Sequence, residues 1–124
     1  MIEARELRIG NLLYYWRSGI KHETVVESIS ANQTINGVEE DLTSWEYLSS
    51  FTGIPITEQW LLKLGFTQAK NYQQGVLSLN GIRMIIHQDK WTFNDMNRSK
   101  IITTVHQLQN LYYALTGEEL TLIE

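Results

Sequence analysis

Histidines are the residues of this sequence with the clearest capacity for chemistry. His22, His87 and His106 could ligate zinc or exchange protons near neutral pH. None of them belongs to an H-x-x-x-H pair or to another pattern with metal-ligand spacing, so a shared zinc site would have to arise from folding alone. The pattern favours three separate histidines and predicts no metal site.

Other catalytic patterns are missing as well. The chain has no cysteine, which excludes disulfides, thiolate zinc sites and thiol catalysis. No serine lies in a G-x-S-x-G turn, and the glycines are spaced singly rather than in a phosphate-binding loop. The consecutive carboxylates Glu39, Glu40 and Asp41 point in different directions and lack calcium-loop spacing. We therefore expect no catalytic residue, no cofactor and no enzyme.

Aromatic residues are more abundant than a domain of 124 residues needs, with four Trp, six Tyr and three Phe. This excess indicates that part of the aromatic surface serves an interface. A polar cluster, His87 to Asp89, ends a predicted strand beside aromatic residues, which is a typical place for binding groups. The candidate binding residues are Tyr15, Trp16, Tyr72, Arg83, His87, Lys90 and Trp91.

These candidate binding residues are compatible with two different functions. The first is a non-enzymatic binding module that contacts a host or phage protein, or a second copy of the chain, through exposed aromatics and loops. The alternative is a small-ligand protein that binds or sequesters a nucleotide-like signal, with Trp91 or Tyr72 stacked on a base and Arg83 or Lys90 at a phosphate. The net charge of −4 and the scattered basic residues argue against a nucleic-acid partner.

The first half of the chain must position these residues mainly through strands. Ile9 to Trp16 is almost entirely β-branched, aromatic or aliphatic and ends in a turn, Arg17 to Gly19, which predicts a strand. His22 to Ser30 should pair with it as a hairpin, and Thr34 to Val38 should add a short third strand. Glu39 to Ser50 fits either a helix or a loop.

The second half predicts a hairpin and a further short strand. Tyr72 to Leu79 and Ile82 to His87 flank Asn80-Gly81, a pair that tolerates the positive φ angles of a type I′ turn. Trp91 to Phe93 should place two aromatic rings on one face of a strand. The polar stretch Asn94 to Lys100 is expected to be a mobile loop.

Two helices have both ends marked in the sequence. Thr57 can cap a helix over Glu58 to Leu64, and Thr104 with Gln107 forms a capping box before a helix that begins at Val105. In the second helix Leu108, Leu111 and Leu115 share one stripe and should be buried. Glycines follow both helices, Gly65 and Gly117.

These elements predict a single α+β domain over residues 1–124, with a small antiparallel sheet, a β-hairpin and two helices. The opening hairpin is also compatible with an SH3-like partial barrel. Both faces of the first strand are apolar, so either both are covered or one is an exposed aromatic patch. Tyr15 is expected to be partly exposed and to contribute to a binding surface.

Two features suggest a biological context. The segments ELRIGNLLYY, IPITEQWLLKLGF and VHQLQNLYYALTGEEL resemble an uncharacterised family of short proteins from Bacteroidetes and their phages and prophages. This resemblance implies a phage or mobile-element accessory protein but no activity. The charged N-terminus is unlike a signal peptide, and no apolar run is long enough to span a membrane. We therefore expect a cytoplasmic protein without a membrane partner.

Overall fold

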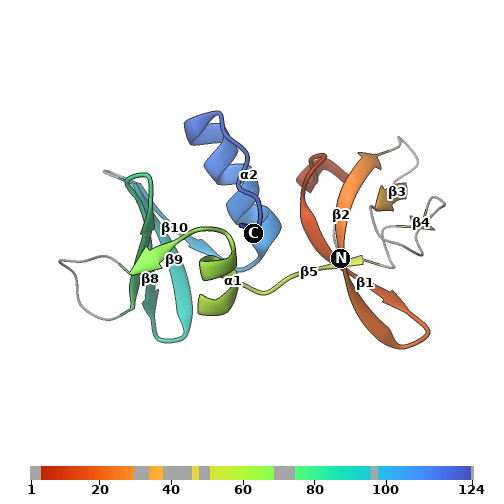
Figure 1. The fold of residues 1–124 in the computed structure, drawn as a ribbon, viewed down its shortest axis with the longest axis horizontal. Helices are drawn as coiled ribbons and strands as arrows, with labels where there is room; N and C mark the ends of the chain where they lie inside the picture. Colours follow the sequence, from red (N-terminus) through yellow and green to blue (C-terminus); the bar gives the residue numbers. More distant parts are fainter. Residues whose placement is uncertain are drawn as a thin grey trace.

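The computed structural model describes residues 4–29, 34–37, 46–47, 51–68, 75–95 and 98–123. Over these residues the chain has an α+β fold with two open antiparallel sheets of five strands each, one 3-10 helix and two α-helices. Figure 1 shows the sheets at opposite ends of the molecule, with the second α-helix between them. The predicted α+β class is confirmed, and neither sheet closes into a barrel within the described residues.

The first sheet begins with the predicted hairpin. Its strands are arranged in the order β4-β3-β2-β1-β5. Arg17 pairs with Ile20 across a two-residue turn in which Ser18 and Gly19 have φ angles of 53° and 77°. Most of Glu39 to Ser50 lies outside the described residues. The elements are η1 (Ala4–Glu6), β1 (Leu12–Arg17), β2 (Ile20–Ile29), β3 (Thr34–Gly37), β4 (Glu46–Tyr47) and β5 (Phe51–Gly53).

The second sheet contains the predicted Asn80-Gly81 hairpin, and its strand order is β10-β9-β8-β7-β6. Asn80 and Gly81 have φ angles of 52° and 84°, as a type I′ turn requires. Trp91 and Phe93 lie on one face of β9, as predicted, and both are buried. The strands are β6 (Thr67–Gln68), β7 (Val76–Leu79), β8 (Ile82–His87), β9 (Lys90–Asp95) and β10 (Arg98–Ile102).

The prediction of a loop over Asn94 to Lys100 was wrong for most of its length. Asn94 belongs to β9, and β10 begins at Arg98 and pairs with β9 in antiparallel register. Polar side chains do not prevent strand pairing at the edge of a sheet, because they remain in water while the main chain forms the ladder. Ile102 then anchors the end of β10 in the core.

Both helices have the predicted ends. In α1 (Glu58–Lys63) the Thr57 hydroxyl accepts a hydrogen bond from the main-chain nitrogen of Trp60, and Gly65 follows with a φ angle of 101°. In α2 (Val105–Thr116) Thr104 and Gln107 form the reciprocal capping box, and Gly117 is left-handed. Leu108 is fully buried, whereas Leu111 and Leu115 are partly buried against the main core.

The face of β1 that carries Leu13 and Tyr15 is covered, so the expectation of an exposed Tyr15 was wrong. Leu12 belongs to the main core with the helices and the second sheet. Leu13 and Tyr15 belong to a second, smaller core with Leu7 and Phe51. Tyr15 is only 6% exposed, and its ring centroid lies 5.1 Å from that of Phe51. Leu7, which follows η1, packs on this face, and Phe51 of the neighbouring strand β5 lies beside Tyr15 as its cross-strand partner.

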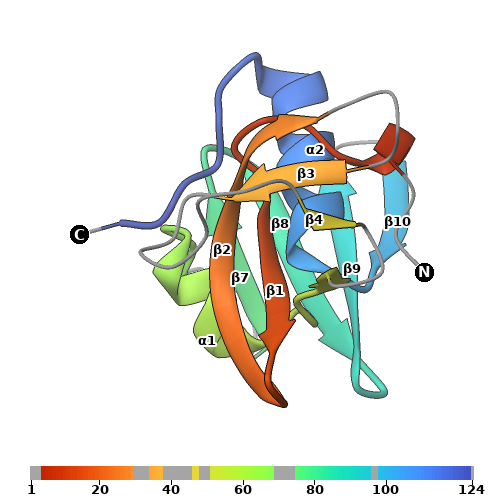
Figure 2. The same cartoon turned by 90° about the vertical axis from the view of Figure 1, so that its right-hand side faces the viewer.

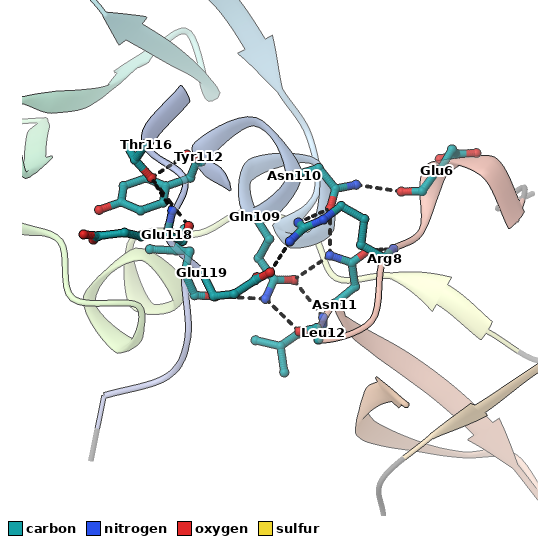
Figure 3. Close-up of polar contacts among 12 residues, drawn as sticks. Glu6, Arg8, Asn11, Leu12, Gln109, Asn110, Tyr112, Thr116, Glu118 and Glu119 are labelled. Carbon is teal, nitrogen blue, oxygen red and sulfur yellow. Dashed lines mark hydrogen bonds and ion pairs between the residues drawn. The ribbon is translucent and has the colours of Figure 1, made fainter. Parts of the chain in front are cut away.

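Helix α2 joins the two sheets. Seen face-on in Figure 2, the first sheet lies in front of α2 and the second sheet. Gln109 of α2 is 1% exposed, and its Oε1 accepts a hydrogen bond from the main-chain nitrogen of Leu12 at 2.8 Å. Its Nε2 donates to the carbonyls of Gly10 and Leu120 (Figure 3). Every polar atom of this buried amide therefore has a partner.

A short ladder completes the connection between the sheets. The main-chain nitrogen of Ile56 donates to the Thr103 carbonyl at 3.1 Å, and that of Val105 donates to the Ile54 carbonyl at 2.8 Å. Pro55 and Thr104 form an isolated antiparallel bridge between these bonds. The segment that leaves β5 and enters α1 is thus fixed to the start of α2.

Candidate binding cleft

An open cleft of about 380 Å³ lies between the two halves of the fold. One wall comes from the first sheet and includes Tyr14, Trp16 and Lys21 of the β1–β2 hairpin. The other wall is the start of α1 and includes Gln59 and Trp60. Three of the lining side chains are therefore large aromatics, and they come from elements far apart in the sequence.

Trp16 is the most exposed of these rings, with 46% of its surface accessible. It lies two residues after Tyr14 in β1, so strand alternation places both rings on the same face of the sheet. The indole nitrogen of Trp16 donates a hydrogen bond to the Thr52 hydroxyl at 3.2 Å. This bond fixes the orientation of the ring while much of its surface remains in contact with water.

Two lysines lie over the aromatic rings of the cleft walls. The Lys21 nitrogen is 4.2 Å from the centroid of the Tyr14 ring, and the Lys63 nitrogen is 4.5 Å from that of Trp60. Neither lysine forms an ion pair with another residue in the described ranges. Their positive charges are held at the walls by the electron-rich ring faces and are not neutralised by a described carboxylate.

The α1 wall is rigid because it belongs to the main core. Trp60 is only 5% exposed, so little of its ring is accessible from the cleft. The Thr57 hydroxyl oxygen accepts from the Trp60 nitrogen as the helix cap, which leaves its hydrogen available to donate. The side chain of Gln59 is exposed and makes no hydrogen bond to another described residue. This wall therefore offers hydrogen-bond donors beside an apolar surface.

A second cavity of about 290 Å³ shares Thr52 and Gly53 with the cleft and contains His106. The Nε2 of His106 lies 3.5 Å from a carboxylate oxygen of Glu6, and its buried Nδ1 has no hydrogen-bond partner. Burial lowers the pKa of His106 from its ordinary value of 6.5, and the Glu6 carboxylate opposes this shift.

The hydroxyls beside His106 do not form a nucleophile–base pair with it. The Thr103 hydroxyl donates to the Gln107 side chain at 2.9 Å, and the Thr104 hydroxyl accepts from the Gln107 main chain. Both threonines are thus used in capping α2. A histidine without a hydrogen-bonded hydroxyl lacks the arrangement that activates such a group for attack.

The predicted binding residues do not form one site. Trp16 lies in the cleft, whereas Tyr15 is buried in the second core, and Tyr72 is outside the described residues. Arg83 and His87 lie on one face of β8, and Ile86 lies on the other. Ile86 is the cross-strand partner of Trp91, so Arg83 and His87 point away from the face that carries Trp91. Trp91 faces the core and is 6% exposed, so it cannot stack on a base beside Arg83.

Lys90 and Trp91 do meet at another cavity, of about 320 Å³, at the end of β10. Its walls are apolar apart from Thr103 and the hairpin turn, and Arg83 and His87 do not line it. The residues that sequence reasoning missed are Tyr14, Lys21 and Trp60. The alternation of Tyr14 with Trp16 was a usable signal, but no local pattern brings β1 next to α1.

Comparison with protein-family models, with curated proteins and with solved structures finds no match for this chain. In the described part of the chain, no helix has the length and apolar character needed to cross a membrane. The same residues contain no cluster of three or more His, Asp or Glu side chains able to hold a metal ion.

Proposed function

We propose that this protein is a non-enzymatic binding module that holds a segment of a partner protein in the cleft between the β1–β2 hairpin and α1. The observation that carries the proposal is Trp16, a large ring that is 46% exposed and yet oriented by a hydrogen bond to Thr52. Tryptophan is enriched at the energetically dominant positions of interfaces. A fixed, exposed indole loses little conformational entropy when a partner covers it.

The shape of the cleft favours a protein segment over a small molecule. Small-ligand sites typically bury about 70–90% of the ligand surface. This cleft is open to solvent rather than enclosed, so it suits a chain that crosses it. The family resemblance adds a context to the proposal, in which the partner is a host or phage protein in a bacterial cytoplasm.

A nucleotide-like ligand is the second candidate, because Trp16 and Lys21 are cross-strand partners and place a ring beside an ammonium group. This site replaces the predicted one at Trp91 and Arg83. A thermal-shift panel of nucleotides tests it, since a ligand at a hundred times its Kd stabilises the fold by ~2.7 kcal/mol. A shift that Lys21→Ala removes would favour this candidate, and a flat panel would refute it for the nucleotides used.

The proposed function is tested by capture of a partner from lysates of uninfected and phage-infected Bacteroidetes cells. The immobilised wild-type protein is compared with Trp16→Ala and with Ile101→Ala, which removes an exposed apolar side chain of β10 outside the cleft. We expect a protein that wild type and Ile101→Ala recover and Trp16→Ala does not. Recovery of the same proteins by all three would refute the role of the cleft.

A further inference from the structure

Strand β5 has one paired edge and one free edge. It is the end strand of the first sheet and pairs with β1 in antiparallel register, and no strand of the described residues lies on its other side. The short ladder to the start of α2 begins at Ile54, just beyond β5. A free edge presents N–H and C=O groups to which another chain can add as a strand.

The main-chain groups of β1 alternate between its two neighbours. The Asn11 carbonyl accepts a hydrogen bond from the Val26 nitrogen at 2.8 Å, just before β1 begins. At the other end of β1, Arg17 and Ile20 flank a two-residue turn, and residues that flank such a turn are hydrogen-bonded to each other. The odd-numbered residues of β1 are therefore directed to β2, and the even-numbered ones, including Tyr14, are directed to β5.

The same alternation identifies the groups at the free edge of β5. Thr52 pairs with Tyr14 and is directed to β1, so Phe51 and Gly53 direct their N–H and C=O groups to the free edge. These groups have no hydrogen-bond partner among the described residues. Phe51 and Gly53 also line the second cavity, of about 290 Å³. The cavity therefore borders main-chain donors and acceptors that a further strand can satisfy.

The cleft and the cavity lie on opposite faces of β5. Thr52 shares a face of the sheet with Trp16, and the cleft lies on that face. A Cβ atom on Gly53 would lie 3.1 Å from Cε1 of His106, so the other face of β5 borders the cavity that His106 and Glu6 line. A strand added at the free edge would therefore direct alternate side chains into the cleft and into the cavity.

Charge distinguishes the two places. Among the described residues that line the cavity, Glu6 carries the formal charge, because burial keeps the pKa of His106 below its ordinary value. The whole chain also has a net charge of −4. A basic side chain is therefore attracted into the cavity, and an acidic one is repelled. On the other face, the exposed ring of Trp16 offers an apolar contact.

We infer that a segment of the partner protein adds to the free edge of β5 as a short strand, with an apolar side chain in the cleft and the next side chain, a basic one, in the cavity. The inference rests on the proposed function and adds how the main chain of the partner is held. The segment bonds to the main chain of Phe51 and Gly53, and its apolar side chain covers Trp16. Pairing stops at Gly53, because the Ile54 carbonyl already accepts from Val105.

Amide hydrogen exchange of the isotope-labelled protein tests whether the edge is free. After correction for residue type, the amides of Phe51 and Gly53 should exchange at least about tenfold faster than that of Thr52, which is bonded within the sheet. Equal protection of all three amides at every protein concentration would mean that the edge is occupied within the monomer. Protection that grows with protein concentration would mean that a second copy of the chain occupies it. Either result would overturn the inference.

A synthetic peptide of about five alternating lysine and valine residues with blocked ends is the binding probe, long enough to pair with all of β5. It should shift the resonances of β5 and of the Trp16 indole and slow exchange at Phe51 and Gly53. Two N-methylated forms keep its side chains and charge, one methylated at the lysine amides and the other at the valine amides. Because alternate amides of a strand face opposite edges, one form should bind at least about tenfold more weakly and the other like the parent. Equal binding of both forms, or no shift at millimolar peptide, would overturn the inference.

A charge variant tests the cavity separately. Glu6→Gln should weaken binding of the lysine–valine peptide by about threefold or more and reduce its advantage over a glutamate–valine peptide. The matched control Glu118→Gln changes an exposed acid outside the cavity and should bind like wild type. Wild-type affinity of Glu6→Gln would refute the basic side chain. If lysate capture depends on Trp16 while both methylated peptides bind alike, the cleft remains a binding site and only strand addition is wrong.

Discussion

Replacement of Gln109 by leucine should reveal how much the buried amide contributes to the fold. The side chain is 1% exposed and connects β1, α2 and the segment that follows α2 (Figure 3). Gln109→Leu keeps a similar size but removes the partners of the Leu12 nitrogen, at 2.8 Å, and of the Leu120 carbonyl, at 3.0 Å. Both bonds are buried, so water cannot replace them.

The expected loss of stability follows from these two groups. A buried donor or acceptor without a partner costs about 1–3 kcal/mol, so the pair costs about 2–6 kcal/mol. Small domains are stable by only about 5–15 kcal/mol. With a urea m-value of about 2 kcal/mol/M, the midpoint of unfolding should fall by about 1–3 M.

Urea unfolding followed by circular dichroism and tryptophan fluorescence measures this change. The matched control is Gln68→Leu, which alters an exposed glutamine at the edge of the second sheet and should change stability by less than about 0.5 kcal/mol. Gln109→Glu should be at least as harmful as Gln109→Leu, because a carboxylate would face the Gly10 and Leu120 carbonyls. A Gln109→Leu variant with the wild-type midpoint would refute the assigned role of the network.

Three further predictions concern stability and its pH dependence. Leu108→Ala should cost about 2–5 kcal/mol in urea unfolding and Leu111→Ala clearly less, because only Leu108 is fully buried; equal losses would contradict this. Gly81→Val should lower the Tm, since Gly81 has a φ angle of 84° that β-branched residues disfavour, and an unchanged Tm would mean that the turn tolerates the strain. Burial lowers the pKa of His106, so the unfolded chain binds a proton at this histidine more readily than the folded protein does. The folded state should therefore keep its full stability above pH 6.5 and lose part of it as the pH falls below that value. Urea unfolding of wild type and His106→Gln on both sides of that pH measures the difference, and identical pH profiles would refute it.

Local signals in the sequence were enough to predict much of the fold. The Asn80-Gly81 turn and the capping box of Thr104 and Gln107 were correct because each depends on residues within one turn of the chain. Alternating apolar residues likewise predicted the first hairpin. These patterns reflect steric and hydrogen-bonding demands that the neighbouring residues satisfy by themselves.

Features that depend on distant partners were not predictable in the same way. Arg98 to Lys100 form a strand because β9 supplies the ladder, although their composition is that of a loop. Tyr15 is buried because Leu7 packs on its face of the sheet and Phe51 is its cross-strand neighbour in β5, and neither contact follows from the pattern around Tyr15. Arg83 and Trp91 point to opposite faces of the second sheet, because side chains alternate along each strand and Ile86, not Arg83 or His87, is the cross-strand partner of Trp91. The pairing of β8 with β9 determines this arrangement, and the residue types alone do not reveal it.

The two walls of the cleft are positioned by α2, a helix whose residues do not line it. Gln109 fixes the start of β1, while Val105 and Thr103 hold the segment from Ile54 to Ile56 that leads into α1. Both walls are therefore held by a common element, and the distance between them is set before a ligand arrives. A preformed cleft loses less entropy on binding than one that a ligand must assemble. The residues that hold the two walls are consequently structural ones in α2 and in the segment just before it, while the residues that would contact a partner lie in β1, β2, β5 and α1.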